Sequence, residues 1–516
     1  MIRRKLPIGI QTFRRIREDD CYYVDKTAYI ARLIDEGTHY FLSRPRRFGK
    51  SLLVDTLKEL FEGSEPLFRG LDVHGGWDWS TCHPVVRLDF SGGNFRKPGF
   101  LEEHATAQME DIGKRAGIGS GSTGSAPVRF RRLIQALCEQ AGRRVAVLVD
   151  EYDKPILDTL DDPDVAKANR DDLRGLYGTI EACDAQVEFT FLTGVSKFSK
   201  SSLFSDLNNL TDITLDSDYS ALCGYTEADM DAVFAAELPG LDRGEIRDWY
   251  NGYNWLGDER VYNPYDILHL FRTRRFEAHW YRAGAPAFLV ETLTRRGVAS
   301  TALENLRTGD ARLDAFDVGA VATEALLFQS GYLTIRDAER QGGRTLYRLG
   351  YPNREVRQSL NDSLLDRLLP EPRREENGLQ LLELLRADDM DGLEAWLKSL
   401  FAGIPYEWHT RNDVARYEGY YASVFYSHFA ALGLDLVVEE SSSHGRLDMA
   451  VRFAGRVYLF EFKVMEQASK GAALAQLQVR GYADKYRGAG QPIRLIGVEF
   501  SRETRNIAAF EVERIT

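Results

Sequence analysis

Residues 43–51, Ser-Arg-Pro-Arg-Arg-Phe-Gly-Lys-Ser, constrain the fold of this 516-residue chain more than any other segment. The preceding residues 38–42 are typical of a buried strand, and residues 52–61 carry apolar side chains at helical spacing. A strand, a tight loop and a helix N-terminus together form an anion-binding site, because the unpaired N–H groups of the first helical turn point at the ligand. This segment matches the usual phosphate-loop pattern except that Arg44 stands where the pattern has its first glycine.

The intact half of this pattern assigns roles to two side chains. We expect Lys50 to reach the terminal phosphates of a nucleotide, and the Ser51 hydroxyl to hold Mg²⁺. The alternative is that Gly-Lys-Ser recurs here by chance. The residues expected to line the phosphate site are Arg46, Arg47, Phe48, Gly49, Lys50 and Ser51.

A second motif about a hundred residues later favours the nucleotide interpretation. Residues 145–149 form an apolar run that ends in Asp150 and Glu151. Asp150 is expected to hold Mg²⁺ through water, and Glu151 to orient or deprotonate the attacking water. A further strand over residues 187–192 ends at Thr193–Ser196, where a polar side chain could contact the water or the γ-phosphate. The chain carries no guanine-reading Asn-Lys-x-Asp, so ATP is expected rather than GTP.

The bulk composition is that of an ordinary globular protein. The formal charge of −12, from 66 basic and 78 acidic residues, does not indicate nucleic-acid binding. Any such binding therefore needs a local basic surface. The five cysteines are scattered without Cys-x-x-Cys spacing, which argues against zinc and suits a reducing cytoplasm. We also expect no membrane span and no signal peptide, because no apolar run has the necessary length.

The chain divides by pattern into four parts. Residues 1–215 alternate strands and helices, as an α/β core does, and residues 216–280 turn helical, with Thr226 as a helix cap. Aromatic pieces at 249–255 and 261–265 suit packing, with base stacking as the alternative.

Residues 281–375 combine helices with one hairpin, and the final part is residues 376–516. In the third part we expect strands over 326–335 and 345–349, joined by a Gly342-Gly343 turn, and a helix over 354–368. This combination suggests a winged-helix-like module, which either binds DNA or packs beside the core.

A different chemistry is indicated near the C-terminus. Asp448 precedes a turn at 454–456, and Glu461 and Lys463 follow in an apolar strand. Because side chains alternate faces along a strand, Glu461 and Lys463 share one face, and a hairpin brings Asp448 beside them. Two carboxylates suit Mg²⁺, and Lys463 would position the water that attacks a phosphodiester. The alternative is an ordinary strand with a surface salt bridge.

Helices on either side of this hairpin add candidates. Glu418 in the upstream helix is a candidate extra metal ligand. Gln476, Gln478, Arg480 and Tyr482 come from a downstream helix, in which Gln478 and Tyr482 are four residues apart and therefore expected on one face.

Together these motifs resemble, over almost the whole chain, a family with an N-terminal AAA-ATPase-like domain and a C-terminal PD-(D/E)XK nuclease-like domain. The Asp448, Glu461 and Lys463 spacing matches the nuclease signature, with Leu447 in place of its proline. The resemblance also implies that Arg44 is a family feature rather than damage to the loop. The other segments that carry it are residues 6–9, 23–27, 44–51, 149–153, 193–199, 208–210, 262–265 and 445–448.

The resemblance implies an α/β fold. It consists of a P-loop NTPase core of AAA type with a helical lid, a winged-helix-like middle region and a C-terminal α/β restriction-endonuclease-like domain. The expected cofactors are ATP and Mg²⁺, and the expected partner is nucleic acid, DNA ahead of RNA, with a homo-oligomer as an open option. We therefore expect an ATPase fused to a Mg²⁺-dependent DNA nuclease, with defence against foreign DNA as a conceivable role. The alternative is a nucleotide-dependent switch or scaffold whose C-terminal domain binds without cutting.

Overall fold

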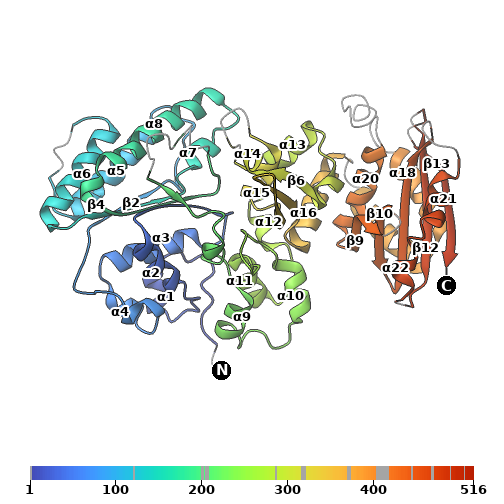
Figure 1. The fold of residues 1–516 in the computed structure, drawn as a ribbon, viewed down its shortest axis with the longest axis horizontal. Coiled ribbons are helices and arrows are strands. Elements are labelled where there is room, and N and C mark those ends of the chain that lie inside the picture. The colour runs from blue at the N-terminus through green and yellow to red at the C-terminus, as the bar shows by residue number, and fades with distance from the viewer. Residues whose placement is uncertain are drawn as a thin grey trace. The chain divides into compact units, whose positions relative to one another are not determined.

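The computed structural model describes residues 3–119, 123–198, 203, 209–284, 287–314, 316, 321–368, 373–402, 418–442, 445–465, 470–488, 490–501, 503–504 and 506–515. The chain packs into two compact units (Figure 1). The first unit contains Met1–Trp280 and Arg307–Asn353, and the second contains Tyr281–Leu306 and Arg354–Thr516. The expected boundaries at residues 215, 280 and 375 remain predictions. No helix within the described ranges combines the length and hydropathy needed to cross a bilayer.

The first unit is built on a five-stranded parallel sheet of order β2-β3-β4-β1-β5. β1 and β3 are buried along their whole length, as strands of a parallel sheet covered on both faces are. The carboxyl ends of β1, β3 and β4 therefore meet at one edge, where ligands of such sheets bind. The strands are β1 (His39–Ser43), β2 (Val85–Asp89), β3 (Val145–Asp150), β4 (Val187–Gly194) and β5 (Thr211–Asp212).

Helices cover both faces of this sheet. Figure 1 shows α1 to α4 on one face and α5, α6 and α8 on the other. α3 starts directly after the phosphate loop and packs on β3, as the apolar spacing predicts. The bounds are α1 (Phe13–Glu18), α2 (Thr27–Glu36), α3 (Lys50–Phe61), α4 (Glu65–Phe68), α5 (Phe100–Arg115), α6 (Ala126–Ala141), α7 (Lys154–Leu157) and α8 (Pro163–Ala182).

Three helices lie in the segment that we expect to be the lid, α9 (Glu227–Val233), α10 (Arg243–Tyr250) and α11 (Pro264–Thr273). The predicted cap is confirmed, because Thr226 accepts a hydrogen bond from the Asp229 N–H in a reciprocal capping box. Apolar side chains of these helices pack around Tyr22 and Val24, so the lid shares a core with the N-terminal segment.

A three-stranded sheet, β6-β8-β7, completes the first unit, with α14 (Asp310–Leu313) and α15 (Thr323–Gln329) beside it. The predicted turn is confirmed, because Gly342 and Gly343 both have positive φ angles between the two hairpin strands. The predicted strand over 326–335 is wrong in its first half, which is the helix α15. Every residue of 324–329 is buried, and a short apolar run of this kind fits a buried helix as well as a strand. The strands are β6 (Leu306–Gly309), β7 (Thr334–Gln341) and β8 (Arg344–Gly350).

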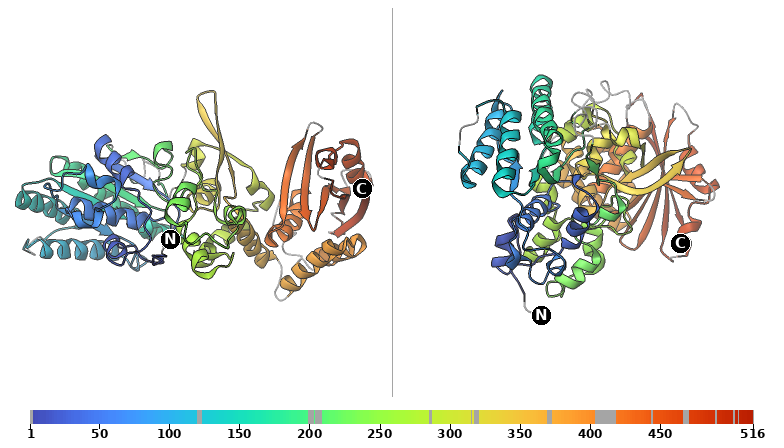
Figure 2. Two further views of the ribbon diagram at one scale, coloured as in Figure 1. Left: turned by 90° about the horizontal axis from the view of Figure 1, so that it is seen from below. Right: turned by 60° about the vertical axis from the view of Figure 1, so that its left-hand side comes forward.

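The second unit carries a mixed sheet of order β13-β12-β11-β10-β9, in which only β11 and β12 are parallel neighbours. Figure 2 shows this sheet with helices on both sides. The strands are β9 (Asp435–Ser442), β10 (Gly445–Phe453), β11 (Arg456–Val464), β12 (Ile493–Ser501) and β13 (Asn506–Ile515). The helices are α13 (Ala287–Arg295), α16 (Arg354–Leu368), α17 (Arg373–Ala387), α18 (Met390–Ala402), α20 (Glu418–Ala431), α21 (Ala472–Val479) and α22 (Asp484–Arg487). α12 (His279–Gly284) lies at the change from the first unit to the second.

The two faces of β11 pack against different hydrophobic clusters. Phe460 and Phe462 lie in the cluster with α17, α18 and α20, whereas Val457 and Leu459 lie in the cluster with α21 and Tyr482. The predicted alternation is thereby confirmed, and Glu461 and Lys463 lie on the side of α21.

Candidate functional site

The phosphate loop connects β1 to α3 at the carboxyl edge of the parallel sheet. Gly49 precedes the helix with φ of 94°, a conformation that favours glycine, and α3 begins at Lys50. The N–H groups of the first turn of α3 are therefore directed into the loop, as the motif requires. Arg46 and Arg47 are exposed on the loop, whereas the Phe48 ring is buried against Tyr253 and Trp255.

The Lys50 side chain is folded into the loop. It is buried, and its Nζ donates hydrogen bonds to the carbonyl oxygens of Arg44 and Pro45, each at 3.0 Å. These are weak neutral acceptors, so phosphate oxygens can replace them with stronger charge-assisted bonds.

Arg44, the departure from the usual pattern, has a structural role. Its guanidinium is fully buried and donates to the carbonyl oxygens of Ser43 and Thr214, both at 2.9 Å, and of Tyr219 at 3.1 Å. It also lies 4.1 Å from the centroid of the Trp255 ring. Burial lowers the pKa of Arg44 to about 10. The Arg44 side chain thus connects the start of the phosphate loop to residues 214–219, which precede the expected lid.

Restoring the usual glycine should consequently harm the protein. Arg44→Gly leaves three carbonyl oxygens without their donor and opens a cavity, which we expect to lower the free energy of unfolding by roughly 3–5 kcal/mol. Denaturant unfolding of the full chain measures this effect in the first unit. Arg46→Gly, at an exposed loop position, is the control and should cost less than about 1 kcal/mol. Equal losses in the two variants would contradict the structural role of Arg44.

A cavity of about 400 Å³ opens between the phosphate loop, the N-terminal segment and the lid. Its lining combines the charged groups of Lys50 and Glu151 with apolar side chains such as Ile10, Val24 and Leu268. A ligand with a polyphosphate and an apolar ring system suits this mixture. Most of the aromatic residues in 249–255 and 261–265 are buried in packing, although Tyr265 lines the cavity.

The two acidic residues after β3 differ in environment. Asp150 is 1% exposed, and among the described residues neither of its oxygens has a hydrogen-bond partner of ordinary geometry. Burial raises the pKa of Asp150 to about 6, and Asp89 and Glu151 add to the rise, while the nearby Ser51 and Lys50 oppose it. A buried carboxylate without a donor fits a divalent cation. Glu151 adopts a φ of 50° and lines the cavity, where a water-activating carboxylate would have to be.

The hydroxyl groups at the end of β4 are occupied within the protein. Thr193 is buried and donates to the Leu42 carbonyl oxygen at 2.9 Å, and Ser196 donates to Asp153. Asp153 also accepts the Ser196 N–H at 2.6 Å. These contacts give both hydroxyl groups a structural role, and the suggested contact with the water or the γ-phosphate stays a prediction.

The second site lies on the α21 face of β10 and β11. Lys463 Nζ lies 3.1 Å from Glu461 Oε1, and Gln476 of α21 donates to the same oxygen. Asp448 Oδ2 accepts the Phe462 N–H at 2.8 Å, which holds this carboxylate against β11. The structure therefore brings together the three residues that the C-terminal motif singles out.

Glu461 has the electrostatics of a metal ligand. It is 1% exposed, and its Oε2 has no hydrogen-bond partner among the described residues. Burial, reinforced by Asp448, raises the pKa of Glu461 to about 7, while Lys463 lowers it. A cation bound between Asp448 and Glu461 would compensate this buried charge.

This shift predicts a pH-dependent stability in the absence of metal. Glu461 binds its proton more tightly in the folded chain, so folding is favoured at low pH and loses stability as pH rises from about 4.5 through 7, by at most about 3 kcal/mol. Glu461→Gln removes the titrating charge. With EDTA present, we expect the melting temperature of the variant to rise relative to the wild type between pH 5.5 and 8. A constant difference across this range would contradict the shift.

The residues after β11 correct one prediction. Gln478 donates to Glu513 at 2.7 Å on an exposed surface, and Gln476 is the glutamine that contacts Glu461. α21 ends at Val479, so the helical spacing between Gln478 and Tyr482 does not apply. Tyr482 is buried beside the site, and burial and Glu461 both raise its pKa.

The third expected ligand stays a prediction. Glu418 is the first residue of α20, and its side chain lies outside the described residues. Over the described ranges, no group of three or more His, Cys, Asp or Glu side chains forms a ready metal site. Asp448 and Glu461 are therefore the two candidate metal ligands of this site whose side chains the structure describes.

Comparison with known proteins identifies one domain family in each half of the chain. A family model described as "predicted AAA-ATPase" matches residues 7–204, and a model of the PD-(D/E)XK nuclease superfamily matches residues 416–510. The chain is 58% identical over 519 residues to an "uncharacterized protein in vnfD 5′ region" of Azotobacter chroococcum mcd 1, and the match covers 100% of both chains. The phosphate loop and Asp150 lie in the first matched region, and Asp448, Glu461 and Lys463 lie in the second. The chain therefore belongs to the family that joins an N-terminal AAA-ATPase-like domain to a C-terminal PD-(D/E)XK nuclease-like domain.

Proposed function

We propose that this protein binds and hydrolyses ATP and cleaves DNA in a Mg²⁺-dependent reaction that ATP controls. The observation that supports the proposal is that one chain contains two separate sites, each with a buried carboxylate beside a lysine. Asp150 lies beside Lys50, and Glu461 lies beside Lys463. The free state of all five cysteines, which lie in the described ranges, suits the reducing cytoplasm that we propose as the location.

In the ATPase half, Lys50 and the N–H groups at the start of α3 bind the terminal phosphates. Ser51 and Asp150 would hold Mg²⁺, which when bound neutralises charge on the phosphate oxygens. Glu151 accepts the proton of the attacking water, because it lines the cavity and is less enclosed than Asp150. The Lys50 side chain is buried and therefore shielded from bulk water, which strengthens its attraction for the phosphates.

In the nuclease half, Asp448 and Glu461 would hold Mg²⁺, which when bound stabilises the charge that develops on the phosphodiester. Lys463 orients the attacking water and stabilises its hydroxide form. Gln476 holds the Glu461 carboxylate by its hydrogen bond, and the Phe462 N–H holds Asp448, so both carboxylates are fixed before the cation arrives.

DNA is the proposed substrate, and defence against foreign DNA is a role that such a fusion would suit. The purified chain should be incubated with single-stranded DNA, plasmid DNA and RNA, with and without Mg²⁺ and ATP. We expect DNA cleavage that requires Mg²⁺ and changes with ATP. Cleavage of RNA alone would make RNA the substrate.

The second candidate function is a nucleotide-dependent switch whose nuclease-like domain binds without cutting. The acidic net charge of −12 favours it mildly, because strong nonspecific attraction to nucleic acid is not expected. Retention of DNA in a gel-shift assay, without cleavage at any Mg²⁺ concentration, would favour this candidate.

A further inference from the structure

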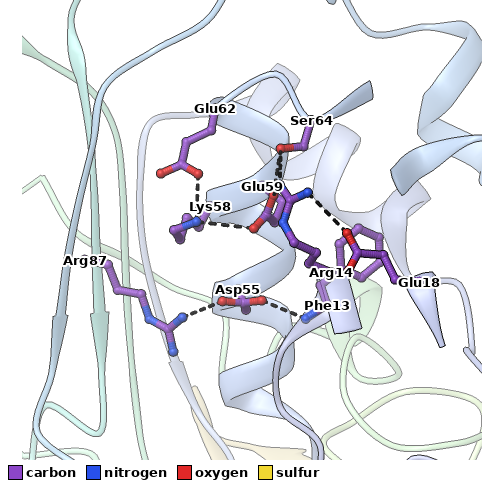
Figure 3. Close-up of polar contacts among 9 residues, drawn as sticks. All are labelled: Phe13, Arg14, Glu18, Asp55, Lys58, Glu59, Glu62, Ser64 and Arg87. Atoms are coloured by element: carbon purple, nitrogen blue, oxygen red, sulfur yellow. Dashed lines mark hydrogen bonds and ion pairs between the residues drawn. The ribbon is translucent and has the colours of Figure 1, made fainter. Parts of the chain in front are cut away.

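A polar network beneath the phosphate loop links α3 to its surroundings (Figure 3). Asp55 and Glu59 lie one turn apart on α3, and their side chains are only 8% and 5% exposed. Each binds one arginine, Arg87 from β2 and Arg14 from α1, respectively. The two carboxylates are therefore alike in burial, but their arginines extend to different parts of the fold, and the Arg14 side chain is 48% exposed whereas that of Arg87 is 24% exposed.

Asp55 joins the nucleotide cavity to the sheet. Its Oδ2 accepts the Phe13 N–H at 2.7 Å, and its Oδ1 accepts from Arg87 Nη1 at 2.6 Å. Phe13 begins α1, and the preceding residues Gly9, Ile10 and Gln11 line the cavity. The same carboxylate thus holds the cavity wall and orients Arg87.

The other end of the Arg87 guanidinium faces the proposed metal ligand. Nη2 lies 4.0 Å from Asp150 Oδ2 and 3.9 Å from Asp89 Oδ2. β2 and β3 are adjacent, with Asp89 opposite Asp150 in register, so the strands place these groups together. At 4.0 Å the contact with Asp150 is beyond hydrogen-bond length and acts through charge.

We propose that Arg87 is a positioning residue of the ATP site, a counter-charge held back by Asp55 that competes with Mg²⁺ for Asp150. Asp55 takes the short hydrogen bond and so keeps Arg87 from closing on Asp150. A cation that approaches Asp150 is repelled by the guanidinium, and the repulsion grows if Arg87 moves closer. The inference rests on the proposed ATP function and assigns residues that the nucleotide motifs do not contain.

Arg14 provides the matched control. It donates to Glu59 at 2.7 Å and to Ser64 at 3.1 Å, and lies 3.5 Å from Glu18. All of these partners lie on or beside α1 and α3 (Figure 3). Arg14→Gln therefore removes a guanidinium from a buried carboxylate of α3 just as Arg87→Gln does, and leaves the contact between Arg87 and Asp150 in place.

The test is the dissociation constant of ATP measured by titration calorimetry on the full chain, in EDTA and in saturating Mg²⁺. The dissociation constant in EDTA divided by the dissociation constant in Mg²⁺ reports how strongly the metal increases the affinity for ATP. Arg87→Gln should raise this ratio by about three- to tenfold, because one repelling charge is lost. Asp55→Asn should lower it by roughly threefold, because Arg87 is freed to approach Asp150. Arg14→Gln and the charge-preserving Arg87→Lys should stay within about twofold of the wild type.

The opposite signs separate this proposal from general damage, which would move both variants in one direction. Equal shifts in Arg87→Gln and Arg14→Gln, or shifts of the same sign in Arg87→Gln and Asp55→Asn, would overturn the role of Arg87 while ATP binding itself persists. If Asp55→Asn does not fold, the ratio of dissociation constants in the other variants tests the role of Arg87. It should rise in Arg87→Gln and stay near the wild-type value in Arg87→Lys and Arg14→Gln. A wild-type chain that binds no ATP would overturn the proposed function as well.

Discussion

Asp448→Asn is expected to slow Mg²⁺-dependent DNA cleavage strongly while ATP hydrolysis continues. Asparagine keeps an oxygen that can accept the Phe462 N–H, so the local fold is preserved and the change is one of charge. Loss of one of the two carboxylates proposed to hold Mg²⁺ should cost about 3–4 kcal/mol of transition-state stabilisation, which corresponds to a fall in rate of about 10²- to 10³-fold. Single-turnover cleavage of a labelled duplex measures the effect.

Asp435→Asn is the matched control for this prediction. Asp435 lies on β9 of the same sheet and forms an exposed ion pair with Arg452 at 3.3 Å. Such pairs contribute about 0–1 kcal/mol, so cleavage should be unchanged. A wild-type cleavage rate in Asp448→Asn would exclude the proposed nuclease site.

The second large effect is expected at the phosphate loop. Lys50→Ala removes the buried ammonium that would bind the terminal phosphates, and ATP affinity should fall by about 30-fold or more, the range of a buried charge-assisted hydrogen bond. Glu151→Gln should retain ATP binding, because it removes the proposed base and not the phosphate contacts, and should lower hydrolysis by about 10²-fold. Calorimetric binding and phosphate release distinguish the two variants.

Lys58→Ala serves as the control, because Lys58 lies on the same helix but does not line the nucleotide cavity, and it pairs with Glu62 at 2.7 Å and with Glu59 at 3.3 Å (Figure 3). Its ATP affinity and hydrolysis should match those of the wild type. Unchanged ATP binding in Lys50→Ala would remove the nucleotide assignment, whereas full hydrolysis in Glu151→Gln would remove only the role of that carboxylate.

The elements around both sites could be predicted because their signals are local. A short apolar run predicts the strand before the phosphate loop, and apolar residues at helical spacing predict the helix after it. The structure has these elements as β1 and α3. Likewise, a turn between two strands and the alternation along β11 bring Asp448, Glu461 and Lys463 together.

The supporting residues could not be predicted, because their partners are distant in sequence. Arg44 binds carbonyl oxygens about 170 residues away, at Thr214 and Tyr219, so the sequence alone indicates only a missing glycine. Arg87 is a single arginine in a strand, and only the folded arrangement of α3 and β3 reveals Asp55 and Asp150 as acidic neighbours. By contrast, the end of α21 at Val479 has a local signal in Gly481, which adopts a φ of 58° directly after the C-cap residue Arg480, and this end leaves Gln476 as the glutamine in contact with Glu461.

The proposed function requires that the nucleotide site and the nuclease site act in one mechanism. The most direct measurement is the single-turnover rate of DNA cleavage at fixed free Mg²⁺, with and without ATP, for the wild type and for Lys50→Ala. We expect ATP to change the wild-type rate and to leave the Lys50→Ala rate unaltered. A wild-type rate that is the same in both conditions would contradict it.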